Sequence, residues 1–548
     1  MASPAPPAAP AAATDRSAAL VAAGILLSRL SGIVRETVLS AILGASTNAA
    51  EAFAFSLQIP KILQNLLGEG ALSASFIPVY SNVVDKSPAA GRRLAGAVFG
   101  LLVALVGALV LILIFAAGPI VNILAPGASD QRVDLIAELV RVMAPGIGFI
   151  VFAAWCLGLL NAHRDFFLSY VAPMLWNVAI IVALVAWATQ TDDLASLARA
   201  GAWGVFAGGV AQFAVQLPRV LRTAGPIQPS LDRTDAHVRE VIRRFIPGVA
   251  GRGVVTLSTF TDLALASFLA VGAVAVLTKA QTLYLMPISV FAVSIAAADL
   301  PELSRMNASS SAAASRVRTA IDRVSLFVLF SAIAFIFGGR SLVAAIFERG
   351  QFGADDSFVV WLTLAAFSFG LLASALSRVF QAASFAQGDV AGPAKIALAR
   401  LVVAAVIGLV LMWPADRYQV IDGLISRTGG FDFAPLPQDV RDLQSSHRLG
   451  SVGLAAGGAV AAWLEFVLLR RRLNQVTNNL GVWAAFRRLL LAGVVSGLVI
   501  VLLVWLLGGL HPLLTAPLTL GPAGLLYLVI ARKTGNSTAE ALLGRFSV

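Results

Sequence analysis

Long apolar runs constrain this chain more than any other feature of its sequence. A helix that crosses a bilayer needs about 20 predominantly apolar residues, and about fourteen runs of that length occur along the chain. They lie at residues 17–43, 50–80, 94–124, 133–161, 170–189, 201–221, 241–270, 273–299, 319–338, 357–386, 395–413, 449–469, 487–509 and 512–531. The sequence therefore predicts an all-α polytopic membrane protein with about 14 transmembrane helices.

The composition supports this prediction and excludes other classes of protein. Apolar residues make up 58% of the chain and charged residues 13%, against about 45–50% and 25% in soluble domains. A water-soluble enzyme is thereby excluded. The single cysteine, Cys156, excludes a disulfide framework and a cysteine-based metal site, and the four scattered histidines argue against a histidine metal cluster.

The excess of basic residues lies in the connections between the apolar runs. Lys and Arg number 40 against 29 Asp and Glu, a net charge of +11. Basic clusters such as Arg92–Arg93, Arg243–Arg244 and Arg470–Arg472 follow even-numbered runs, whereas Asp192 and Asp355 follow odd-numbered runs. Because cytoplasmic loops are rich in Lys and Arg, both termini are predicted to be cytoplasmic. No nucleic-acid partner is expected.

The sequence around the second run resembles that around the eighth. Pro60 and Pro78 are 18 residues apart and Pro287 and Pro301 are 14 apart, a difference of about one helical turn. A true repeat predicts two six-helix lobes in a pseudo-two-fold arrangement, plus two extra C-terminal helices; the alternative is chance similarity between apolar helices. Secondary transporters are often built from such repeats, with the substrate held between them.

We divide the chain accordingly. Residues 1–16, rich in Ala and Pro, are predicted to form a disordered cytoplasmic tail. The N-lobe (spans 1–6) is placed at 17–221, a cytoplasmic linker at 222–240, the C-lobe (spans 7–12) at 241–469, and spans 13–14 with a cytoplasmic tail at 470–548. The C-lobe includes an extracytoplasmic loop at 414–448, which we predict to be a flexible insertion and to which we assign no role.

Charged residues inside the spans carry most of the functional information, because each costs at least a few kcal/mol unless it faces water or a partner. Arg29 and Arg35 lie six residues apart in the first span, about 9 Å along the helix axis. Guanidinium groups bind phosphate oxygens bidentately, so the pair predicts a cationic patch in a cavity. The alternative is a structural ion pair of Arg35 with Glu36 or Glu69.

Further cations recur on the spans that open the two proposed lobes. Lys61 lies in span 2, Arg252 in span 7 and Lys279 in span 8. Their clustering with the arginines of span 1 predicts a central cavity that attracts an anionic substrate. For each residue taken alone, a buried structural salt bridge is the alternative.

Several longer motifs lie around spans 1–2 and 10–11. They are Ser28-Arg29-x-x-Gly32-x-x-Arg35, Glu51-Ala52-Phe53, Ile59-Pro60, Gly68-Glu69-Gly70-Ala71, Arg349-Gly350-x-Phe352 and Phe385-Ala386-x-Gly388-Asp389. In these motifs the chain resembles the MurJ (MviN) family of the MATE-like exporter (MOP) superfamily, from about residue 17 to 400.

The resemblance implies a flippase of the bacterial cytoplasmic membrane, not an enzyme. Its substrate would be lipid II, the undecaprenyl-pyrophosphate-linked peptidoglycan precursor, moved to the outer leaflet by alternating access through a cationic cavity between two lobes arranged in a V. Other cell-wall synthesis proteins are further candidate partners. The substrate-binding residues that the motifs and the charge pattern indicate are Ser28, Arg29, Arg35, Glu51, Lys61, Gln64, Arg252, Lys279 and Thr282.

Two of these positions depart from the family pattern. Gln64 and Thr282 stand where the family has arginines, and a lysine precedes each by three residues, at Lys61 and Lys279. Positions i and i+3 share a helix face, so our hypothesis is that the lysines compensate for the missing arginines. The competing explanation is a loss of lipid II specificity or a different polyprenyl-linked substrate.

The driving force and the alternative functions follow from the same residues. Asp262 in span 7 is a candidate site for a coupling cation, sodium or a proton, because some members of the family resemble sodium-coupled carriers. A salt bridge from Asp262 is the alternative, and the membrane potential is another energy source.

The alternative functions are a MATE-like exporter of another polyprenyl-linked glycan or small molecule, a membrane-embedded enzyme, and a non-transporting scaffold.

Overall fold

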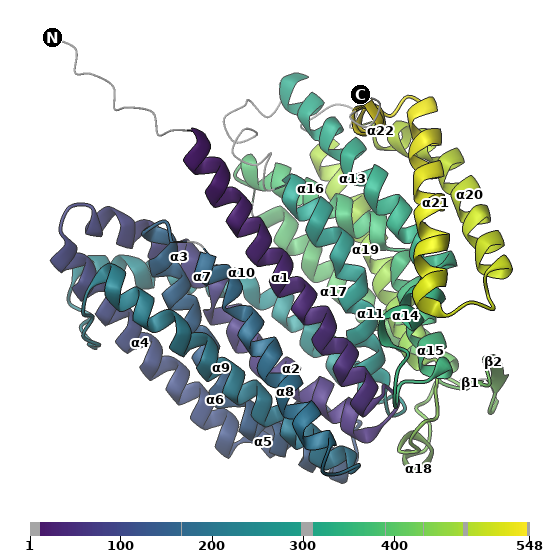
Figure 1. Cartoon of the computed structure of the whole chain (residues 1–548), viewed down its shortest axis with the longest axis horizontal. Helices are drawn as coiled ribbons and strands as arrows, with labels where there is room; N and C mark the ends of the chain where they lie inside the picture. The colour runs from purple at the N-terminus through teal and green to yellow at the C-terminus, as the bar shows by residue number, and fades with distance from the viewer. Residues whose placement is uncertain are drawn as a thin grey trace. The chain divides into compact units, whose positions relative to one another are not determined.

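The computed structural model describes residues 11–165, 167–296, 311–389, 391–430, 432–474 and 481–544, most of them helical (Figure 1). Ten of the described helices are long and apolar enough to cross a membrane, and α15 (Ala354–Ser368) with α16 (Leu371–Ala386), bent by 45° at the break between them, passes the same test as a pair. Three further predicted spans fall on helices that contain several charged residues. The span at 17–43 is α1, the span at 50–80 is α2 with α3, and the span at 241–270 lies on α10. The prediction of an all-α polytopic membrane protein is confirmed.

The chain divides into two compact units. Unit 1 comprises residues 1–43, 52–124 and 130–257, and unit 2 comprises residues 44–51, 125–129 and 258–548. The division falls inside α10, whereas the predicted lobe boundaries, with a linker at 222–240, stay a prediction. Helix α1 begins at Ala11, so residues 11–16 of the predicted tail are helical, and residues 1–10 lie outside the described residues.

Unit 1 is a bundle of helices around an aromatic core. Trp155 of α6 is 1% exposed, and its ring centroid lies 4.6 Å from that of Phe99 in α4. Helices α6 and α9 touch through Gly146 and Gly209, where a Cβ on Gly209 would lie 2.0 Å from the Gly146 carbonyl oxygen. The helices of unit 1 are α1 (Ala11–Leu43), α2 (Asn48–Leu67, whose residues up to Glu51 belong to unit 2), α3 (Glu69–Val84), α4 (Pro88–Phe115), α5 (Ala117–Leu124), α6 (Asp130–Ala162), α7 (Phe167–Val171), α8 (Pro173–Ala188), α9 (Leu194–Ala224) and the first part of α10 (Ala236–Ala266).

Unit 2 is built on a second core between α13, α15 and α16. Leu364, Leu371 and Phe380 are fully buried in it, and α17 packs along α19. Its further elements are α11 (Ala273–Pro287), the π-helix η1 (Ile288–Val293), α13 (Ser311–Phe337), α14 (Gly339–Phe347), α17 (Ala391–Ala415), α18 (Gln438–Arg441), α19 (Gly450–Asn474), α20 (Val482–Leu506), α21 (Pro512–Lys533) and α22 (Ser537–Gly544).

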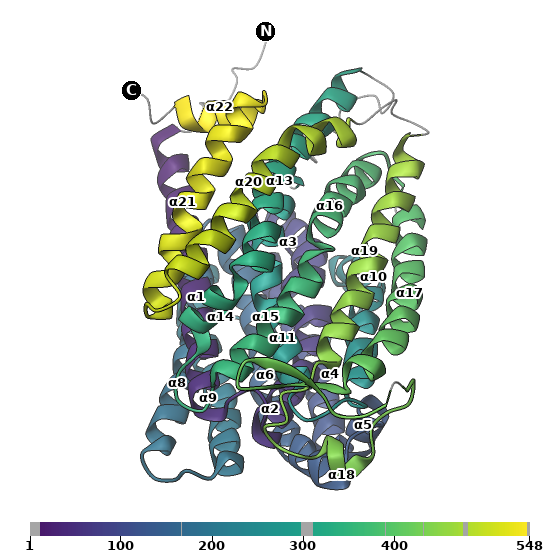
Figure 2. The same ribbon diagram turned by 90° about the vertical axis from the view of Figure 1, so that its right-hand side faces the viewer.

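Helices α20 and α21 form the predicted pair of extra spans at the C-terminal end of unit 2 (Figure 2). They pack on each other and on α13 and α14. Gly493 and Gly497 lie against Ile333 and Phe337 of α13. The opposite face of α20 exposes large apolar side chains, Leu498 among them, as expected for a surface in contact with lipid.

The loop at 414–448 contains some regular structure, whereas its predicted flexibility stays a prediction. Strands β1 (Tyr418–Ile421) and β2 (Leu424–Arg427) pair antiparallel, with Tyr418 opposite Arg427. The turn is Asp422-Gly423, with φ of 51° and 74°, as a two-residue hairpin turn requires. Strands of four residues are too short to show an alternating pattern, and the Asp-Gly pair was the signal that the sequence analysis passed over.

Candidate substrate-binding site

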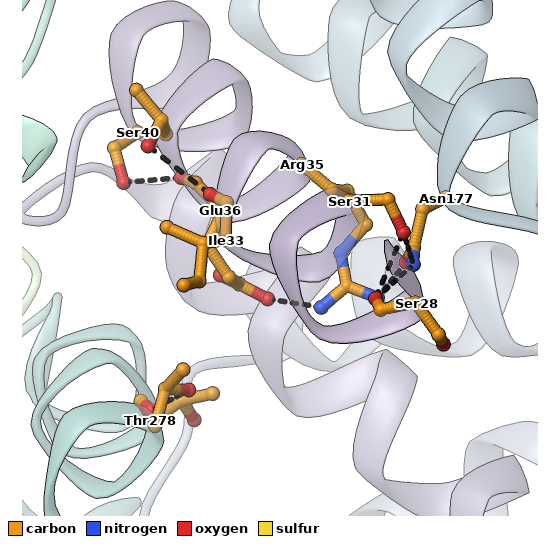
Figure 3. Close-up of polar contacts among 10 residues, drawn as sticks. Ser28, Ser31, Ile33, Arg35, Glu36, Ser40, Asn177 and Thr278 are labelled. Carbon is orange, nitrogen blue, oxygen red and sulfur yellow. Dashed lines mark hydrogen bonds and ion pairs between the residues drawn. The ribbon is translucent and has the colours of Figure 1, made fainter. Parts of the chain in front are cut away.

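Arg35 of α1 is held by polar and aromatic partners within unit 1 (Figure 3). Its guanidinium donates a 3.0 Å hydrogen bond to Oδ1 of Asn177, forms an ion pair with Glu36, and lies 4.8 Å from the ring centroid of Trp176. Only 8% of Arg35 is exposed. This conformation therefore contains the ion pair between Arg35 and Glu36 that was the predicted alternative.

Asn177 connects the same region of α1 to α8. Its amide Nδ2 donates a 2.8 Å hydrogen bond to the Ser31 hydroxyl, and the Ser31 hydroxyl donates to the Ser28 carbonyl oxygen at 2.8 Å (Figure 3). No role was predicted for Asn177 from the sequence. A lone amide in an otherwise apolar span was the available signal, because a buried amide must find hydrogen-bond partners.

Lys61 of α2 belongs to the same charged group. Arg35 and Glu36 are its charged neighbours within unit 1. Helix α2 contains Pro60 immediately before Lys61, and Gln64 follows one turn later on the same face. Arg29, two turns before Arg35 on α1, is exposed, and Ser28 is partly buried. The structure thus brings together Arg35 and Lys61.

Lys279 and Thr282 lie on α11 in unit 2. The ammonium of Lys279 is 5.7 Å from the ring centroid of Phe347 and 5.8 Å from that of Phe352, within cation–π range. Lys279 is 5% exposed. The Thr282 hydroxyl donates to the Thr278 carbonyl oxygen at 2.9 Å, inside its own helix. That Lys279 compensates for the arginine missing at Thr282 stays a prediction.

Glu51 caps the N-terminus of α11. Its carboxylate accepts hydrogen bonds from the backbone N–H of Val274 at 2.9 Å and of Ala275 at 3.4 Å, and Glu51 is 2% exposed. The first N–H groups of a helix lack partners within the helix and carry partial positive charge. Gly272, at the start of α11, has no side chain to supply that cap. The structure gives Glu51 this role, and its contact with substrate stays a prediction.

The remaining predicted residues lie on α10. The backbone of Arg252 is helical, but its side chain lies outside the described residues. Asp262 is partly buried in unit 2, and Arg400 of α17 is its charged neighbour. The predicted alternative, a salt bridge from Asp262, stays a prediction.

Arg400 and Glu465 are charged residues that the sequence analysis missed. Nη1 of Arg400 donates a 2.7 Å hydrogen bond to Oε2 of Glu465, whose side chain is 2% exposed. Each lies in a predicted span, at 395–413 and 449–469. A carboxylate in the middle of span 12 was the signal, since a buried carboxylate requires a partner.

Comparison with known proteins places this chain in a family. Residues 39–420, more than half of the chain, match the family model described as lipid II flippase MurJ. A probable lipid II flippase MurJ from Rhizobium tropici is 28% identical over 522 residues, covering 93% of this chain and 91% of the relative.

Two solved structures share the fold. A lipid II flippase MurJ in an inward closed conformation has a TM-score of 0.72 at 20% identity, covering 93% of this chain and 98% of the other. An inward-facing multidrug resistance MATE family transporter of the MOP superfamily has a TM-score of 0.61 at 16% identity, covering 82% and 95%. The all-α fold is thus common to both groups of transporters. The chain belongs to the MurJ family of lipid II flippases.

Proposed function

We propose that this chain translocates lipid II from the cytoplasmic to the outer leaflet of the bacterial cytoplasmic membrane, as a transporter. The observation that supports the proposal is the buried guanidinium of Arg35 in unit 1, which has Glu36 and Asn177 as partners and Lys61 as a charged neighbour. Family membership supplies the substrate, which is the one named for the relatives.

The physical problem is the desolvation of a charged headgroup. A pyrophosphate cannot cross about 30 Å of hydrocarbon without partners for its charges. Cationic side chains on several helices reduce that cost while the polyprenyl tail stays in lipid. The residues proposed to bind the headgroup are Arg29, Arg35, Lys61, Arg252 and Lys279. Several modest contacts allow release after the lobes rock to the other side, whereas one tight site would retain the substrate.

The partners of Arg35 suggest how binding and release are balanced. Glu36 occupies one side of the guanidinium and Asn177 holds the other in place. A phosphate oxygen would replace the Glu36 carboxylate, and the return of Glu36 would favour release. Asn177 would keep the guanidinium oriented throughout. This exchange is a proposal about the order of contacts.

The orientation is proposed from the charges at the helix ends. Basic residues occupy the last turns of α19 and α21, at Arg471, Arg472, Arg532 and Lys533. Cytoplasmic ends of spans are the basic ones, so both termini are proposed to be cytoplasmic. The 414–448 loop is then extracytoplasmic. A coupling cation, sodium or a proton, or the membrane potential is the proposed energy source.

A second candidate function is transport of another polyprenyl-linked glycan. Gln64 and Thr282 favour it, because each replaces an arginine that the family pattern leads one to expect at a position proposed to bind substrate. A neutral side chain gives a weaker contact with phosphate than a guanidinium does. The headgroup chemistry proposed for both candidates is a pyrophosphate.

The direct test uses cells in which the resident flippase is depleted and this chain is supplied instead. The fraction of lipid II in each leaflet is then measured with an impermeant reagent. Wild-type chain is expected to restore lipid II in the outer leaflet, and Arg35→Ala is expected to leave it in the cytoplasmic leaflet. Arg199→Ala is the matched control, because Arg199 forms an exposed ion pair with Glu138 away from these residues. An unchanged leaflet distribution with wild-type chain would contradict the proposal.

A further inference from the structure

A network of polar side chains joins three helices of unit 2. The carboxylate of Glu465 on α19 accepts hydrogen bonds from Arg400 on α17 at 2.7 Å and from Nε2 of Gln381 on α16 at 2.9 Å. Oε1 of Gln381 accepts in turn from Nη1 of Arg378 at 3.2 Å. Glu465 is almost fully buried, so its charge depends on these partners.

Two further residues lie in the field of this network. Asp262 on α10 interacts electrostatically with Arg400. The hydroxyl of Tyr284 on α11 donates a 2.7 Å hydrogen bond to the Ser374 hydroxyl on α16, and Tyr284 interacts electrostatically with Arg400, Arg378 and Glu465. Side chains from α10, α11, α16, α17 and α19 therefore interact with this network, through hydrogen bonds or through their charges.

The charges of this network balance without any bound ion. Asp262 and Glu465 supply two negative charges, and Arg378 and Arg400 supply two positive charges. A site for a hard cation needs surplus negative charge and several oxygen ligands. Adding a cation to a neutral cluster in a medium of low dielectric constant is unfavourable, because like charges repel strongly there. Arg400 is thus the charged neighbour of Asp262, and its positive charge takes the place that a bound cation would have in this balance.

We propose that Arg400 is a built-in counter-cation for Glu465 and Asp262, so that this chain binds no sodium ion beside Asp262. The inference deepens the proposed function, because it makes translocation by this chain independent of a sodium gradient acting at Asp262. The hydrogen bond to Glu465 fixes the position of the Arg400 guanidinium. The negative charge of Asp262 stabilises the positive charge of that guanidinium further. Loss of the guanidinium leaves two carboxylates whose charge sodium can balance.

The test measures the unfolding temperature of the purified full-length chain in detergent with equal concentrations of sodium, potassium or choline chloride. Wild-type chain is expected to unfold at the same temperature in all three salts. Arg400→Gln is expected to unfold roughly 5 °C lower in choline, and sodium is expected to restore most of that loss. A wild-type unfolding temperature raised by sodium alone would overturn the proposal. So would an Arg400→Gln variant that responds to sodium no more than wild type does.

Three variants separate the charge from the fold. Arg400→Lys retains the positive charge and is expected to show no sodium response. The double variant Arg400→Gln with Glu465→Gln keeps Asp262 as the remaining carboxylate and is expected to show a weaker sodium response than Arg400→Gln. Arg199→Gln, in an ion pair whose side chains are each 45% exposed, is the matched control and is expected to behave as wild type. If Arg400→Gln does not fold, the wild-type and Arg400→Lys measurements still decide, because sodium stabilisation of either one contradicts a built-in counter-cation.

The readout also separates this inference from the proposed function. Unfolding temperatures do not depend on whether lipid II is moved. If the unfolding temperature of the chain is insensitive to sodium but lipid II stays in the cytoplasmic leaflet, the counter-cation proposal is supported and the proposed flippase function is contradicted. The opposite pair of results would sustain the flippase and contradict the counter-cation.

Discussion

At the scale of single residues, two described cations, Arg35 and Lys279, lie in different environments. Arg35 has a carboxylate, an amide and an indole ring as neighbours, whereas Lys279 has two phenyl rings. Lysine presents a compact point charge on a flexible stem, and arginine presents a planar fork of donors. A lysine that replaces an arginine therefore keeps charge near a phosphate but gives up bidentate geometry.

The compensation hypothesis makes a prediction at this scale. Lys61→Ala and Lys279→Ala are each expected to reduce flipping by about tenfold or more, since a hydrogen bond to a charged group contributes about 1.5–3 kcal/mol. The measurement is the rate at which lipid II reaches the outer leaflet in the replacement cells. Lys61→Arg is the control and is expected to retain activity. Wild-type rates in both alanine variants would end the compensation hypothesis.

At the scale of elements, the 414–448 loop is fixed to the rest of unit 2 by contacts with residues far away in the sequence. The Asp355 carboxylate accepts from the backbone N–H groups of Asp422 and Gly423, at 3.1 and 2.8 Å, and so holds the hairpin turn. Nη1 of Arg441 donates to the Gly127 carbonyl oxygen at 2.6 Å. Nε2 of His447 lies 3.3 Å from Oδ1 of Asp356 at the start of α15.

The His447 contact predicts a pH-dependent attachment of the loop. Burial alone lowers the pKa of His447, but the hydrogen bond and charge of Asp356, with Asp355 nearby, outweigh burial and raise it above the ordinary 6.5. A histidine whose folded-state pKa is raised stabilises the fold fully below its unfolded pKa, and that stabilisation is lost as the pH rises through the folded-state pKa. Hydrogen exchange in residues 418–448, corrected for its intrinsic pH dependence, is expected to be slower at pH 6 than at pH 8.

Two variants check that assignment. His447→Gln is expected to abolish the difference between pH 6 and pH 8 in the loop. His237→Gln is the matched control, because His237 forms a similar 3.2 Å pair with Asp235 but is largely exposed and belongs to unit 1. A loop that becomes better protected as the pH rises would contradict the role of His447.

The same elements show where sequence reasoning succeeds and where it stops. Helices were predictable because a backbone in hydrocarbon must satisfy its own hydrogen bonds, and apolar length alone signals that condition. The hairpin and the Arg400–Glu465 pair were not predicted, because each depends on a partner from a distant segment: Asp355 for the turn, Glu465 for the guanidinium. Arg35 and Lys61 were identified from charge in an apolar span, but Asn177, which orients Arg35, was not.

At the scale of the whole molecule, the orientation in the membrane rests on the asymmetry of charge between alternate connections. Cys156 is the only cysteine and is buried, so a Cys156→Ala chain offers a background without reactive thiols. Leu231 in the segment between α9 and α10 is 62% exposed, and Leu443 in the 414–448 loop is 56% exposed. These two leucines form a matched pair of sites for a new thiol.

The prediction concerns which of the two thiols lies outside the cell. In spheroplasts, an impermeant maleimide is expected to label Leu443→Cys and to label Leu231→Cys only after the membrane is opened. The physical reason is that the connection around Leu231 carries Arg222, Arg233 and Arg239, and basic connections stay in the cytoplasm. Equal labelling of both thiols in opened membranes serves as the control for reactivity. The reverse pattern would show that the chain has the opposite orientation in the membrane. The substrate would then reach the helices from the opposite leaflet.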